Sequence, residues 1–110
     1  MIGRCAGLTH LAWLPETAGV IELMNYRMEE DVGQDGIEVY EKLAGALGLA
    51  YSQWHNTNPA NHEIVDKRRP GIMANTRVNT TEVCEVVRVM LEQLVREWHE
   101  SSSRAVNRPL

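Results

Sequence analysis

Apolar residues recur at spacings of three and four between positions 83 and 98, a pattern that predicts one long amphipathic helix. The stripe consists of Val83, Val86, Val87, Met90, Leu91, Leu94, Val95 and Trp98. Thr80 or Thr81 can cap the first turn of this helix. We expect the stripe to pack against a core. An interface with a partner is the second interpretation of the same stripe.

Three shorter patterns precede that helix. Residues 20–24 form an apolar run with β-branched side chains and predict a buried strand, and residues 49–54 predict a second one. Between them lies a helical repeat that ends near Gly48, a residue suited to a helix C-terminus. The repeat consists of Ile37, Tyr40, Leu43, Ala44 and Leu47. The order strand, helix, strand with short connections predicts an α/β unit with a parallel sheet.

The remaining segments are a small-residue turn and a long loop. Residues 3–7 (Gly-Arg-Cys-Ala-Gly) predict a turn, and a short helix is expected over residues 8–14, where Pro15 stops it. Residues 55–78 are polar and predict a long loop of the kind that is often functional. Trp13 and Trp54 are expected to pack in the interior.

Two predicted strands are too few for a complete doubly wound sheet. We therefore expect an α/β fold that is the C-terminal portion of a Rossmann-like domain, ending in a long amphipathic helix. Residues 1–99 would form this partial domain. Residues 100–110, which include three consecutive serines, would form a flexible tail.

The composition excludes several classes of protein. Apolar residues make up 44% and charged residues 24% of the 110 residues, which argues against disorder. The net charge of -4 and the lack of a dense basic stripe argue against nucleic-acid binding. No apolar run reaches the length of a membrane helix. Cys5 and Cys84 stand among apolar neighbours and are expected to be buried thiols.

Two positions carry candidate chemistry. In the turn at residues 3–7 and the adjoining Leu8, Thr9 and His10, backbone N–H groups can approach a phosphate closely, although a plain strand-to-helix turn explains the same residues. Glu22 lies within an apolar strand, where a carboxylate is costly to bury unless it is paired. It can hold ribose hydroxyls at the end of its strand, or it can lie on an exposed strand face.

Other chemistry has weaker signals. His10, His55, His62 and His99 are widely separated, so we expect no metal site and a solvent-facing or hydrogen-bonding role for each. Residues 79–81 (Asn-Thr-Thr) form a glycosylation sequon, which would be used at Asn79 only in a secretory lumen.

The residues Ala-Gly-Leu-Thr-His-Leu at 6–11, Trp-Leu-Pro at 13–15 and Val-Ile-Glu-Leu at 20–23 resemble the C-terminal signature of family 61 glycosyltransferases. This family includes the EGF-domain-specific O-linked N-acetylglucosamine transferase. The resemblance covers roughly residues 2–98, and residues 6–23 are its specific part. Arg4 and Cys5 depart from the family pattern, which usually has His and Gly there.

The resemblance implies a GT-B architecture in which this chain is the last part of the donor-binding domain. Backbone groups of Ala6, Gly7, Leu8 and Thr9 would face the diphosphate of a UDP-sugar, His10 would lie nearby, and Glu22 would hold ribose or sugar hydroxyls. The sugar, plausibly N-acetylglucosamine or xylose, would pass to a protein or glycan hydroxyl with inversion and without a metal cofactor.

The acceptor site and the general base would lie mainly in an N-terminal domain of a longer chain, so we expect this piece alone to be inactive. The compartment implied by the resemblance is the lumen of the endoplasmic reticulum or Golgi, with the cytoplasm as the alternative. A second hypothesis is a non-catalytic remnant that binds a partner through its C-terminal helix.

Overall fold

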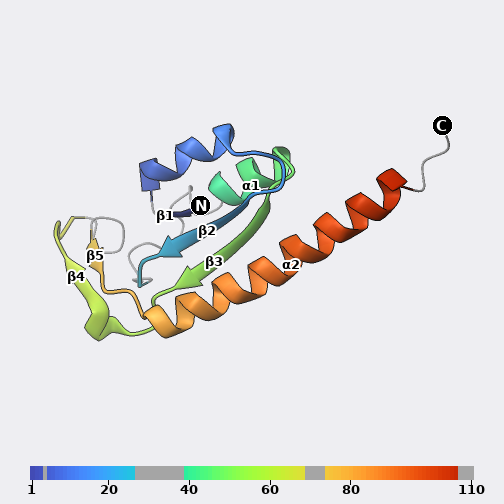
Figure 1. The fold of residues 1–110 in the computed structure, drawn as a ribbon. Coiled ribbons are helices and arrows are strands. Elements are labelled where there is room, and N and C mark those ends of the chain that lie inside the picture. Colours follow the sequence, from blue (N-terminus) through green and yellow to red (C-terminus); the bar gives the residue numbers. More distant parts are fainter. Residues whose placement is uncertain (4, 27–38, 69–73, 107–110) are drawn as a thin grey trace.

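The computed structural model describes residues 1–3, 5–26, 39–68 and 74–106. It is a mixed α/β structure with a small parallel sheet and a long C-terminal helix (Figure 1). Arg4, one of the two departures from the family pattern, lies outside the described residues. The α/β class and the closing helix are therefore confirmed.

Three parallel strands form the central sheet in the order β1-β2-β3. They are β1 (Ile2–Gly3), β2 (Gly19–Met24) and β3 (Ala50–His55). The two strands predicted from the sequence are β2 and β3, and their parallel pairing is confirmed. Strand β1 was not predicted, because two residues are too short to show a period.

Helices cover both faces of this sheet (Figure 1). The 3-10 helix η1 (Cys5–Trp13) and α1 (Val39–Ala46) share one face, and α2 (Thr80–Val106) lies across the other. The first face encloses the main core, a cluster of fully or nearly fully buried side chains. The cluster consists of Leu8, Leu11, Val20, Ala44 and Leu49.

The geometry of η1 explains which of its side chains are buried. A 3-10 helix has three residues per turn, so Leu8 and Leu11 lie on one face, and both are fully buried. Trp13 falls off that face and is exposed, which corrects the expectation that it packs in the interior. Trp54 is buried as expected, and its Nε1 donates to Glu82 Oε2 at 2.8 Å.

Gly48 ends α1 with a left-handed backbone (φ +71°), as the sequence predicted. A Cβ there would have no neighbour within 4 Å, so substitution changes the backbone energy alone. We expect Gly48→Ala to lower the free energy of unfolding by about 1–2 kcal/mol. Gly45→Ala, also without a neighbour within 4 Å but inside the helix, should raise it by about 0.5 kcal/mol. Urea unfolding measures both, and shifts of the same sign would contradict the assignment.

The segment expected to be a long loop contains ordered elements. The short helix η3 (Pro59–Asn61) is followed by β4 (His62–Ile64) and β5 (Ala74–Thr76), which pair antiparallel. The prediction of a structureless loop is therefore wrong. Three-residue strands with mostly polar side chains carry no readable period. They pair with each other through their backbones, and side-chain hydrogen bonds of Asn25 and Asn56 link them to the ends of β2 and β3.

Helix α2 begins and ends differently from the prediction. Its cap is Asn79, whose Oδ1 accepts from the backbone N–H of Glu82 at 3.2 Å, rather than Thr80 or Thr81. The helix continues through the three serines to Val106, so the tail expected over residues 100–110 is helical as far as the described residues reach. Serine is a tolerated helix residue, and Arg104 and Glu100 are paired at 3.8 Å in the last turns.

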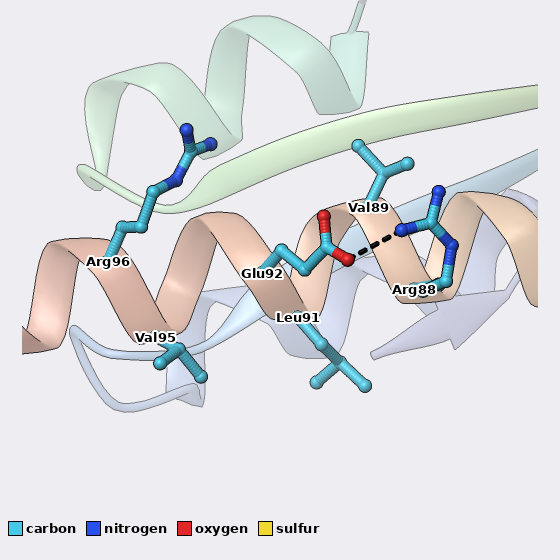
Figure 2. Close-up of a pocket in the computed structure, with 6 residues that line it drawn as sticks. All are labelled: Arg88, Val89, Leu91, Glu92, Val95 and Arg96. Carbon is cyan, nitrogen blue, oxygen red and sulfur yellow. Dashed lines mark hydrogen bonds and ion pairs between the residues drawn. The ribbon is translucent and has the colours of Figure 1, made fainter.

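Only the first part of the apolar stripe packs on the sheet. Met90 is buried, while Leu91, Val95 and Trp98 are 55%, 54% and 58% exposed. The last turns of α2 run past the amino end of the strands and have no sheet beneath them (Figure 1). Leu91 lies next to Met90 and is exposed because it projects on a different side of the helix. Figure 2 shows Leu91 and Val95 projecting on the same side of α2, one turn apart. No helix among the described residues has the length and apolar character to span a bilayer.

Candidate site at the carboxyl edge of the sheet

Glu22 is a buried carboxylate in the middle strand of the sheet. Its side chain is 6% exposed, which excludes the second interpretation given above, that Glu22 lies on an exposed strand face. In the register of the sheet it lies opposite Gly3 of β1 and Gln53 of β3. Since Gly3 is the last residue of β1, this position is close to the point where the chain leaves the sheet for η1.

The hydroxyl of Tyr51 donates to Glu22 Oε1. Tyr51 lies on β3 opposite Val20, so the pair runs diagonally across two strands on the face that η1 and α1 cover. Burial raises the pKa of the Tyr51 phenol above its usual range, and the hydrogen bond to Glu22 raises it further. Tyr51 therefore stays protonated and keeps its role as donor at neutral pH.

Two more polar side chains extend this contact along β3. Gln53 Nε2 donates to Tyr51 Oη at 2.8 Å, and His55 Nε2 lies 2.9 Å from Gln53 Oε1. Alternate residues of a strand share one face, so Tyr51, Gln53 and His55 form a row. We call these three residues with Glu22 the polar row. It leads from a buried carboxylate to an exposed imidazole.

The other predicted site residues lie on η1. Thr9 and His10 are exposed on the solvent side of this helix, whereas the Leu8 side chain is fully buried in the core. Ala6 and Gly7 belong to the first turns of η1, and their surroundings lie outside the described part of the structure. The helix begins at Cys5 rather than at residue 8, so the expected turn over residues 3–7 is shorter than predicted, and its role in anion binding stays a prediction.

Asparagine side chains link the ends of β2 and β3 to the β4-β5 pair by hydrogen bonds. Thr76 Oγ1 donates to Asn25 Oδ1 at 2.6 Å, and Asn25 Nδ2 donates to the carbonyl of Ala74 at 3.5 Å. Asn56, which is buried, donates through Nδ2 to the carbonyl of Asn61 at 3.2 Å. These bonds fix the β4-β5 pair next to the carboxyl edge of the sheet.

Cysteine and histidine chemistry is sparse in the described residues. Cys84 is a free thiol and exposed, which corrects the expectation that it is buried, and the Cys5 side chain lies outside the description. Cys84 falls between the packed and the solvent faces of α2, where apolar neighbours in the sequence do not imply burial. The part of the chain that the structure describes brings together no group of three side chains suited to a metal ion.

Comparisons with known proteins add no relative, since no protein-family model, curated protein or solved structure matches this chain.

The sequence analysis missed two members of the polar row. Tyr51 and Gln53 stand with His55 at every second position of a strand that was itself predicted. That alternation on a predicted parallel strand was the available signal. Parallel strands are usually apolar on both faces, so three polar residues on one face are a departure that indicates a site.

Proposed function

We propose that this chain is the donor-binding part of an inverting glycosyltransferase and that a UDP-sugar binds at the carboxyl edge of the β1-β2-β3 sheet. In this proposal the sheet is the C-terminal portion of a Rossmann-like domain in a GT-B architecture. Ligands of open parallel sheets bind beyond the carboxyl ends of the strands. The observation that supports the proposal best is the register that sets Gly3 beside the buried carboxylate of Glu22.

The start of η1 supplies the anion-binding groups in this proposal. The first N–H groups of a 3-10 helix, at Cys5 and Ala6 in η1, lack i→i+3 partners within it and point toward the preceding strand end. The segment from Ala6 to Thr9, with His10 nearby, would lie against the diphosphate and stabilise the charge that develops on the leaving UDP. Glu22 would act on the sugar or ribose hydroxyls, with Tyr51 on its carboxylate.

The rest of the reaction belongs to a longer chain in this proposal. An N-terminal domain would bring the acceptor hydroxyl and the general base, and the 110 residues alone would show no turnover. The acceptor would be a protein or glycan in the lumen of the endoplasmic reticulum or Golgi. Asn79, which caps α2 and is exposed, would be available there for N-glycosylation.

Binding of UDP to the full 110-residue chain tests the proposal. We expect a Kd between about 1 μM and 1 mM by isothermal titration calorimetry. Gly7→Trp should abolish binding, since a side chain there blocks the approach of a phosphate to the backbone. Glu22→Gln should weaken binding at least about tenfold, the effect of losing roughly 1.4 kcal/mol of interaction.

The matched control for charge removal is Glu63→Gln, because Glu63 is an exposed glutamate on β4. It should leave the Kd unchanged. Circular dichroism on each variant shows whether the chain is folded. A folded chain without measurable affinity for UDP would refute the proposal.

The second candidate function is the non-catalytic remnant that binds a partner through α2. The observation that favours it is the exposure of Leu91, Val95 and Trp98 on a helix whose last turns extend past the sheet. The same UDP titration separates the two candidates, since this one requires no nucleotide affinity. The polar row lies on the face of the sheet that η1 and α1 cover, and α2 lies across the other face, so variants in one leave the other intact.

A further inference from the structure

The hydrogen bonds of the polar row all run in one direction, because each side chain donates to the member nearer Glu22. A carboxylate only accepts hydrogen bonds, so the hydroxyl proton of Tyr51 is directed to Glu22. The Tyr51 oxygen must then accept, and Gln53 supplies its amide Nε2 as the donor. Because the amide nitrogen of Gln53 donates to Tyr51, the amide oxygen of Gln53 faces His55.

This order fixes the proton on the imidazole of His55. The Gln53 oxygen can only accept, so His55 Nε2 must carry a hydrogen. In the neutral imidazole the other nitrogen, Nδ1, is then an acceptor. His55 is exposed, and within the described residues its Nδ1 has no hydrogen-bond partner. The row thus ends at the carboxyl edge of the sheet in an oriented acceptor.

We propose that His55 is a ligand-binding residue whose Nδ1 accepts a hydrogen bond from a hydroxyl of the bound sugar, and that Glu22, Tyr51 and Gln53 are positioning residues that hold its tautomer. The proposal rests on the proposed function. It assigns the sugar to the β3 side of the site and the diphosphate to the η1 side. A lone pair at Nδ1 suits a hydroxyl donor and gives no hydrogen bond to a phosphate oxygen.

Burial of Glu22 supports its role as the anchor of the polar row. At 6% exposed, Glu22 accepts the Tyr51 hydroxyl at Oε1, so the hydroxyl contact of the proposed function falls to Oε2. A buried carboxylate is costly unless it is bonded, so its use here is to anchor the row. Hydrogen bonds in such chains polarise one another, which strengthens the link from Glu22 to His55.

The first measurement is the tautomer of His55 in the free chain. Long-range ¹H–¹⁵N correlation spectra at about pH 8.5 identify the protonated nitrogen of each neutral histidine. We expect His55 to be wholly in the Nε2–H form, and His10, which is exposed on η1, to give the averaged signal of a mixture. Tyr51→Phe should turn His55 into a mixture as well, and Tyr40→Phe should not, because Tyr40 packs against the core outside the row. A mixture at His55 in the unmodified chain would overturn the proposal.

The second measurement compares UDP with UDP-N-acetylglucosamine on the same chain. His55→Ala should weaken binding of the sugar nucleotide about fivefold, the effect of one hydrogen bond, and leave UDP binding unchanged. Tyr51→Phe should reproduce part of this selective loss. If UDP binds and His55→Ala leaves both affinities unchanged, the role of His55 is refuted while the proposed function stands. If neither nucleotide binds the folded chain, both proposals fail.

Discussion

Leu11→Ala is expected to lower the free energy of unfolding by about 2–5 kcal/mol, since Leu11 is fully buried between η1 and the sheet. The loss has two parts, the hydrophobic transfer of the side chain and the cavity that it leaves. Leu8, Val20 and Leu49 line the same cluster and are themselves buried, so the space can close only partly. Urea unfolding followed by circular dichroism measures the change.

Leu91→Ala is the matched control, with the same change of side chain at a position that is 55% exposed. Its effect should stay within about 0.5 kcal/mol. Equal losses at the two positions would contradict the fold described here. A large loss at Leu91 that depends on protein concentration would instead show that its face of α2 is covered in solution.

Gly19→Ala is expected to cost about 1–3 kcal/mol, because the new Cβ would lie 2.5 Å from Met90 Sδ and 3.3 Å from Leu94 Cδ1. Gly19 begins β2, and Met90 is the buried residue of α2 that crosses it. The absence of a side chain at Gly19 is therefore what lets α2 approach the sheet. Unfolding free energies of this variant report directly on that contact.

A double-mutant cycle with Met90→Ala isolates the interaction. Met90→Ala alone should cost about 2–5 kcal/mol, and it opens the space that the new Cβ needs. In that background Gly19→Ala should become nearly neutral, which gives a coupling of about 1–3 kcal/mol between the two positions. Additive losses would show that Gly19 and Met90 are not in contact.

The sequence predicted the elements that have a clear period. The apolar run of β2, the repeat of α1 with Gly48 at its end, and the stripe of α2 all appear in the structure near their expected positions. The cap of α2, predicted at Thr80 or Thr81, was placed one or two residues late. Asn79 and Thr80 are both good caps, and the hydrogen bond from Glu82 decides between them.

The candidate site could be predicted only in part, because its contacts depend on register. Glu22 stood out as a carboxylate in an apolar strand. Its partner, Tyr51, lies on the neighbouring strand two positions before Gln53, the residue directly opposite Glu22. That diagonal follows from the pairing of Val20 with Tyr51, which no local pattern encodes. The exposure of Trp13 likewise depends on which face of η1 meets the sheet, since Trp13 falls off the face that Leu8 and Leu11 share.

The turns of α2 that extend past the sheet affect how this helix unfolds. A helix of 27 residues is about 40 Å long, whereas the six-residue strands beneath it span about 20 Å. The turns beyond Leu94 contain about twelve residues. An isolated helix of that length is only marginally stable in water. Those turns can therefore unwind while the sheet stays folded, and the packed turns up to Met90 open only when the whole structure does. Helix α2 is one element of secondary structure but two units of stability.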